Sequence, residues 1–215
     1  MPTTEICIVP LVPNADVGDP QAEGAKTFKA FTDTLGQQSG VQGIKFGMEH
    51  ENADTLQVFI DWDNIDKHKD FMASETYQPF RQNFSSIMAG PPTIFHADMQ
   101  GSPSKAYGAP VTEVATFWFD GAPPADYIDG ATKFGKLIEE SKFAGYHGLA
   151  VGVTHEELER EGVKGQAAVA IIGWDSVEKH MEFRNTDAFK ENIHLLRSSM
   201  KKVEMHHVAV MSVAL

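Results

Sequence analysis

The chain has 215 residues, 42% of them hydrophobic, and a formal net charge of -12. Nucleic-acid binding depends mainly on Lys and Arg neutralising phosphates, so this acidic balance argues against a nucleic-acid partner. The single cysteine, Cys7, excludes an internal disulfide framework and a multi-thiolate metal site. Neither an export signal nor an apolar run of about eighteen residues is present, so we expect a cytoplasmic protein that does not enter a membrane.

An internal repeat dominates the sequence. The segment Trp62–His68 returns 112 residues later as Trp174–His180, in the same register and with conservative exchanges. Upstream of each copy the matching residues are 105 apart, so the second copy carries seven extra residues before Trp174. The polar, Gly-containing stretch 156–165 is where we expect them, as a lengthened hairpin loop.

The first half reads as strand, helix, two strands, two helices and a strand. Alternating apolar residues indicate half-buried strands, and apolar residues three or four apart indicate helices. In chain order, these elements are expected at Glu5–Pro10, Ala25–Leu35, Ile44–His50, Leu56–Trp62, Ile65–Phe71, Phe80–Ile87 and Thr93–Met99.

The second half repeats this order after a Gly- and Pro-containing linker. Its elements are expected at Thr112–Phe119, Tyr127–Ile138, Gly148–Val153, Ala167–Trp174, Ser176–Met200 and Val203–Val213. We therefore predict a domain at 1–100, a linker at 101–110 and a domain at 111–215. Each βαββαβ unit is typical of the ferredoxin-like α+β fold, whose sheet needs cover on the face without helices. Two fused units can cover each other, which predicts an intramolecular pseudo-dimeric α+β barrel.

Both halves resemble the antibiotic biosynthesis monooxygenase (ABM) domain of the dimeric α+β barrel superfamily. The resemblance is carried by a Trp at the end of the third strand, a His six residues later, and a Ser or Thr before an aromatic residue. The two sets are Trp62, His68, Ser74, Tyr77 and Trp174, His180, Thr186, Phe189. The resemblance implies an activity drawn from cofactor-independent oxygenases, haem-degrading enzymes, polyketide cyclases and isomerases. The oxygenase members carry an Asn on the first strand, where this chain offers Glu5, Cys7, Thr112, Glu113 and Thr116.

Aromatic residues suit either two packed cores or a pocket for a flat ligand. Trp62 and Trp174 follow apolar strand faces, so they either fill the cores or form a flat wall against an aromatic ligand. The residues expected to contact a ligand are Trp174, Trp62, Tyr77, Phe183, His194 and Tyr146.

Histidines supply the candidate bases. His68 and His180 recur in both halves, which favours a structural role over general-base catalysis. His147, His194, His206 and His207 lack a match in the first half, apart from a one-residue register match of His207 with His96. Because residues that break a repeat's symmetry are better candidates for specific chemistry, we rank His207 and His147 first as catalytic residues, before His180 and His68.

No bound metal or cofactor is expected. Glu204 and His206 share a strand face while His207 points the opposite way, so a third ligand would have to come from elsewhere. The chain contains no Gly-rich phosphate loop for a nucleotide or dinucleotide. Cys7 lies in an apolar strand, the setting of an inert buried thiol.

These features lead to a first hypothesis and two alternatives. The first is an ABM-like enzyme that acts on a small aromatic or polyketide-derived molecule by cofactor-independent oxygenation, with a His as base. The alternatives are a polyketide cyclase or isomerase of the same fold, and a non-catalytic ligand-binding or stress-response protein. The expected partner is a small aromatic or apolar molecule, and the fused chain could also form a homodimer.

Overall fold

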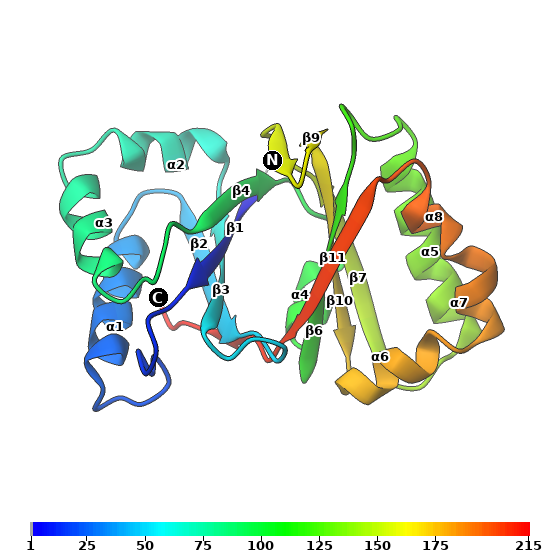
Figure 1. Ribbon diagram of the computed structural model, residues 1–215, viewed down its shortest axis with the longest axis horizontal. Helices are drawn as coiled ribbons and strands as arrows, with labels where there is room; N and C mark the ends of the chain where they lie inside the picture. Colours follow the sequence, from blue (N-terminus) through cyan, green and yellow to red (C-terminus); the bar gives the residue numbers. More distant parts are fainter. Residues whose placement is uncertain (1) are drawn as a thin grey trace. The chain divides into compact units, whose positions relative to one another are not determined.

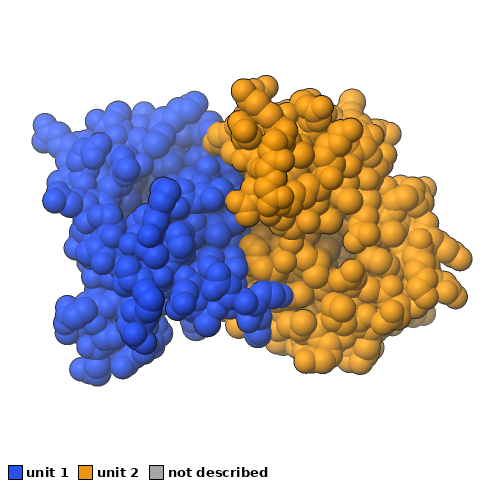
Figure 2. Space-filling view, in the orientation of Figure 1, with its two compact units in different colours: residues 1–96, 211–215 blue, residues 97–210 orange. Residues whose placement is uncertain are grey.

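The computed structural model describes residues 2–215 and divides into two compact units. Unit 1 holds the residues up to His96 together with Met211–Leu215, and unit 2 holds Ala97–Val210 (Figure 2). Each unit has its own hydrophobic core. The repeat in the sequence therefore corresponds to two separately packed bodies.

Unit 1 is a βαββαβ unit with helices on one face of its sheet (Figure 1). The strand order is β12-β2-β3-β1-β4, the ferredoxin-like order with one short strand added at the edge. Its elements are β1 (Thr3–Pro10), α1 (Glu23–Gly36), β2 (Val41–Met48), β3 (Thr55–Trp62), α2 (Ile65–Met72), α3 (Tyr77–Ser85), β4 (Thr93–Ala97) and β12 (Met211–Ser212).

The core of unit 1 follows from the alternation in its strands. The helix-facing residues of β3 are apolar at every second position, and β1 pairs with β3 antiparallel so that Cys7 lies opposite Val58. Phe28, Phe31 and Leu35 of α1 pack against this surface. Inward-facing side chains of β1, β3 and β4 are thereby brought together beneath the helices.

Unit 2 repeats the topology with the strand order β11-β6-β10-β7-β5. Its elements are β5 (Gln100–Gly101), α4 (Pro103–Tyr107), β6 (Val111–Trp118), α5 (Tyr127–Ser141), β7 (Tyr146–Val153), β8 (Leu158–Arg160), β9 (Val163–Gly165), β10 (Ala167–Trp174), α6 (Val177–Phe183), α7 (Asp187–Asn192), α8 (His194–Arg197) and β11 (Lys202–Val208). Strands β8 and β9 pair as a small hairpin, which occupies the predicted loop at 156–165.

Two segments differ from the prediction. The expected linker at 101–110 contains α4, which packs on the unit 2 sheet so closely that a Cβ on Gly173 would lie 2.9 Å from the Cα of Ala106. The expected last strand is interrupted after Val208, and β12 pairs with β2, with Met211 opposite Phe46. Two short strands, β5 in unit 2 and β12 in unit 1, each extend a four-stranded sheet at one edge. The alternation within the longer strands does not predict them.

The fold class is as predicted, namely two ferredoxin-like α+β units in one chain. Among residues 2–215, no helix combines the length and the apolar character needed to cross a membrane.

Candidate functional site

A cavity of about 630 Å³ lies within unit 1, between the sheet and helices α1, α2 and α3. This volume falls within the range typical of small-molecule sites, about 300 to 1,000 Å³. Most of its lining surface is apolar, and polar side chains lie on the core-facing wall and on helix α3. The core-facing wall contributes Glu5, Cys7 and His68, and helix α3 contributes Tyr77 and Arg81.

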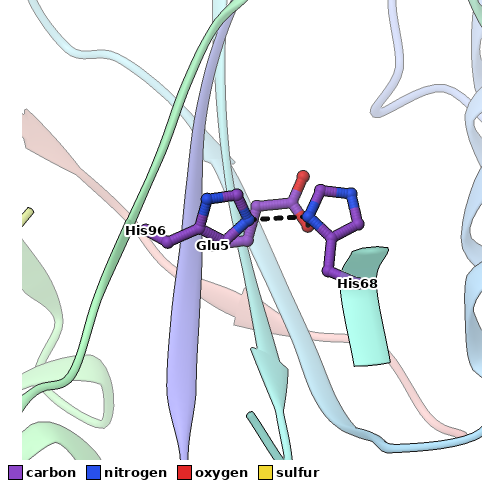
Figure 3. A group of neighbouring side chains, drawn as sticks. All are labelled: Glu5, His68 and His96. Carbon is purple, nitrogen blue, oxygen red and sulfur yellow. Dashed lines mark hydrogen bonds and ion pairs between the residues drawn. The ribbon is translucent and has the colours of Figure 1, made fainter. Parts of the chain in front are cut away.

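Glu5, His68 and His96 form a buried group at this wall, here called the Glu5 cluster (Figure 3). They come from β1, α2 and β4, and none of the three is more than 6% exposed. His68 Nδ1 lies 2.7 Å from His96 Nε2, which makes a hydrogen bond between the two rings. The same nitrogen lies 3.5 Å from Glu5 Oε2. His96 and Glu5 therefore both lie at the Nδ1 edge of the His68 ring.

The position of Glu5 is held by two donors. Trp62 Nε1 donates to Glu5 Oε2 at 2.8 Å, and the Cys7 thiol donates to Oε1 at 3.2 Å. The Trp62 ring stacks on the His68 ring, with centroids 5.1 Å apart and planes 20° apart. Burial, and then the neighbouring Glu5 carboxylate, raise the pKa of the Cys7 thiol well above its usual value. The thiol is therefore protonated at neutral pH.

Unit 2 contains the same residue types at the matching places. Trp174 Nε1 donates to Glu113 Oε2 at 2.9 Å, and His180 Nδ1 lies 2.8 Å from His207 Nε2. We call Glu113, His180 and His207 the Glu113 cluster. Its geometry differs in one respect, because it is His180 Nε2, on the other side of the ring, that lies 3.4 Å from Glu113. His180 thus contacts His207 through Nδ1 and Glu113 through Nε2, whereas His68 contacts both of the corresponding residues through Nδ1.

The cavity is almost closed in unit 2, where it measures about 30 Å³. The reason lies in the residues that correspond to helix α3 at the repeat spacing of 112. Phe189 replaces Tyr77 and packs edge-on against Phe134 and Phe183, and Ile193 replaces Arg81. Apolar side chains thus fill the space that stays open in unit 1. The buried cluster is duplicated, but the cavity is not.

The predicted catalytic histidines fall into two groups. His68, His180 and His207 are buried members of the two clusters, and only His68 lines the large cavity. His147 lies on the surface, with Nε2 2.7 Å from Asp175 Oδ1, and lines neither of these cavities. His96 in unit 1 makes the same contact that His207 makes in unit 2. His207 therefore does not break the symmetry of the repeat, although it is ranked first from the sequence for that reason.

The predicted ligand-contacting residues are also divided. Tyr77 lines the large cavity, whereas Trp62 is fully buried behind Glu5 and His68. Trp174 and Phe183 line the small cavity of unit 2. Tyr146 packs against Trp174 and lines neither cavity, and His194 is exposed with Nδ1 2.9 Å from the Glu191 carbonyl.

Glu5, Glu113, His96 and Arg81 were not among the predicted site residues. The sequence did offer a signal for Glu5. It shares the inward face of its strand with Cys7 and Val9, and a carboxylate is unusual on such an apolar face. Glu204, by contrast, bonds Arg160 and Lys202, so the carboxylate that was weighed as a metal ligand is paired with cations.

No family model and no curated protein matches the sequence. Solved structures match it over nearly the whole chain. An anthrone oxidase-like protein has a TM-score of 0.67 at 14% identity and covers 98% of this chain and 93% of its own. A candidate monooxygenase from Lactobacillus acidophilus NCFM has a TM-score of 0.61 at 12% identity and covers 99% of this chain and 96% of its own.

A shorter solved structure matches less than half of the chain. A candidate antibiotic biosynthesis monooxygenase from Bordetella bronchiseptica covers 45% of this chain and 95% of its own, with 20% identity and a TM-score of 0.40. The longer matches share the fold that the resemblance to tandem ABM-like domains implies. At these identities the comparisons concern the fold alone.

Proposed function

We propose that this chain, which shares its tandem ABM-like fold with the proteins above, is an enzyme that oxygenates a small aromatic molecule in the unit 1 cavity. One observation carries the proposal. A mostly apolar cavity of about 630 Å³ opens onto a buried carboxylate and histidine pair, and the duplicate of that pair in unit 2 has almost no cavity.

The chemistry begins with loss of a proton from a phenol or an acidic carbon of the substrate. His68 lines the cavity and accepts this proton as the general base. Its Nδ1 forms a hydrogen bond with His96 Nε2, which orients the ring in the cavity wall. The Glu5 carboxylate, 3.5 Å away, stabilises the imidazolium that forms. His96 and Glu5 act through His68 and are positioning residues.

The apolar walls then set the course of the reaction. They keep water from the substrate anion, which can transfer electrons to O2 and form a carbon–oxygen bond. For a methylene substrate, the resulting peroxide takes up a proton and loses water to leave a carbonyl. The balance is one CH2 and one O2 giving one C=O and one H2O, so no external reductant is needed. Trp62 supports this site from behind, by holding Glu5.

The experiment that tests this function compares turnover of an anthrone-type phenol under air and under argon, with O2 consumption recorded. We expect one O2 consumed for each molecule of product under air, and no product under argon. Equal turnover in both atmospheres would instead assign a cyclase or isomerase that uses the same base. Saturable binding without product in either atmosphere would assign a ligand-binding protein.

A further inference from the structure

We propose that the Glu5 cluster is also a binding site for one divalent transition-metal ion such as Zn2+ or Co2+. One ligand atom from each of Glu5, His68 and His96 lies within 4.8 Å of the others (Figure 3). Two imidazole nitrogens and one carboxylate oxygen are the donors that such ions prefer. This proposal departs from the metal-free protein expected from the sequence, because the three residues come together only in the fold.

The charge of the cluster favours a cation. Among residues 2–215, Glu5 forms no ion pair with a lysine or an arginine, although it is only 4% exposed. A buried carboxylate is costly unless a cation or hydrogen-bond donors compensate it, and an ion bound by these three ligand atoms would supply that cation.

The geometry needs only a small adjustment. Two ligands bound tetrahedrally at about 2.1 Å from an ion are about 3.4 Å apart. His68 Nδ1 and His96 Nε2 are 2.7 Å apart, so the two rings must separate by less than about 1 Å. The carboxylate already faces the same edge of the His68 ring, and the Trp62 indole holds it there. Such outer contacts orient ligands in protein metal sites.

The cavity supplies access and an open coordination position. Glu5 and His68 both line it, so an ion can reach the cluster and retain a water or ligand on the cavity side. The Glu113 cluster has the same residue types, but its cavity is about 30 Å³. There His180 meets His207 through Nδ1 and Glu113 through Nε2, so one ring nitrogen does not face both partners. Unit 2 therefore provides a matched internal control.

Occupancy by an ion has a consequence for the reaction, and this consequence rests on the proposed function. The ion binds His68 Nδ1 and His96 Nε2, and its positive charge opposes protonation of the same His68 ring by the substrate. Metal binding requires deprotonated ligands and is therefore favoured at higher pH. We expect the bound ion to inhibit turnover and chelation to restore it.

The test is a titration of the full chain with Co2+, followed by visible absorption and by equilibrium dialysis. We expect one tightly bound equivalent, displaced by Zn2+ and weaker at pH 6 than at pH 8. Glu5→Gln and His96→Gln should each weaken binding more than about tenfold. Glu113→Gln and His207→Gln, the matched changes in unit 2, should leave binding within about twofold of the wild type. Thermal melts of all four variants identify any that do not fold.

Other outcomes overturn the proposal. These are the absence of saturable binding up to about 1 mM Co2+, or unchanged binding in both unit 1 variants. If neither unit 1 variant folds, the test is NMR of the wild-type protein with bound Co2+. The ion must then shift the imidazole protons of His68 and His96 more strongly than those of His180 and His207. Binding without turnover of any substrate would refute the proposed function alone, and His68-dependent turnover without binding would refute this inference alone.

Discussion

At the residue scale, one carboxylate determines much of the chemistry of the candidate site. Glu5 accepts a hydrogen bond from Trp62, contacts His68 and receives the Cys7 thiol. The ABM-type oxygenases that the sequence resembles carry a neutral Asn on this strand. In the proposed reaction, this carboxylate stabilises the protonated His68 that forms after proton transfer.

The first prediction compares the two repeated histidines. His68→Gln should lower turnover by about 10² to 10⁴-fold, because it removes the proposed base from the cavity wall. His180→Gln should leave turnover within about twofold, since its cluster has almost no cavity. Steady-state kinetics and melting curves of both variants measure this. Loss of activity in His180→Gln alone would transfer the working site to unit 2.

Cys7 carries the second prediction. Because burial and the Glu5 carboxylate raise the thiol's pKa, few molecules have a thiolate at pH 8. Labelling by a thiol-specific disulfide reagent should be slower by at least about 100-fold in the native protein than in urea. A bulky aromatic ligand in the cavity should slow it further, as Cys7 lines that cavity. Rapid native labelling would contradict both the burial and the effect of Glu5.

Glu49 carries the third prediction, which concerns pH. Burial, followed by the nearby Glu51, raises the pKa of Glu49 from 4.5 to about 7. The folded state therefore holds a proton that the unfolded state has released, and stability falls as the pH rises from about 4.5 to about 7. Glu49→Gln should flatten this slope and raise the melting temperature at pH 7.5. Glu75→Gln, at an exposed position, is the control and should change neither.

At the element scale, one helix distinguishes the two units. Helix α3 presents Tyr77 and Arg81 to an open cavity, while the corresponding helical segment of unit 2 presents Phe189 and Ile193 to a closed one. The strands differ less, since the carboxylate, the Trp and the two histidines occur in both units. The difference in cavity size between the two units therefore lies mainly in a helix that covers the sheet.

The fourth prediction concerns the start of helix α2, which carries His68. The Asn64 side chain accepts from the backbone N–H groups of Asp66 and Lys67. Asn64→Ala should lower the free energy of unfolding by about 1 kcal/mol through loss of this cap. Urea unfolding measures the change. Asn83→Ala, at an exposed position within α3, is the matched control and should change stability by less than about 0.5 kcal/mol.

At the scale of the whole molecule, each unit holds one buried cluster, but the adjoining cavity measures about 630 Å³ in unit 1 and about 30 Å³ in unit 2. Both clusters contain a Trp that donates to a buried carboxylate, so each contributes to the packing of its own unit. The unit 1 cluster adjoins much the larger space. Stability and activity can therefore be separated by comparing the same substitution in the two units.

The fifth prediction makes this comparison. Trp62→Ala and Trp174→Ala should each lower the free energy of unfolding by about 3 to 5 kcal/mol, because both rings are fully buried. Only Trp62→Ala should also abolish turnover at a temperature where both variants are folded, since it releases Glu5. Equal turnover in the two variants would show that the Trp62 contact to Glu5 is purely structural.

The fold was predictable because its signals are local and are present twice. Alternation in segments such as Leu56–Trp62 placed the strands, and the 112-residue repeat required two similar units. The place of the insertion at 156–165 followed from counting residues between matched positions, although the structure forms strands β8 and β9 where a loop was expected. Helix α4 was missed because it stands on a face of the unit 2 sheet where Gly173 leaves room for it, a contact between distant segments.

By itself the sequence determined the α+β class, the duplication, and the residue types that are buried at the ends of the strands. The tertiary structure decided which of them meet. Glu5, His68 and His96 are separated along the chain and converge because β1, α2 and β4 are neighbours in the unit. It also decided which unit has a cavity, because free space depends on how side chains of several elements pack together. A repeat in the sequence shows that two sites are alike in composition, and only packing shows that one of them is open.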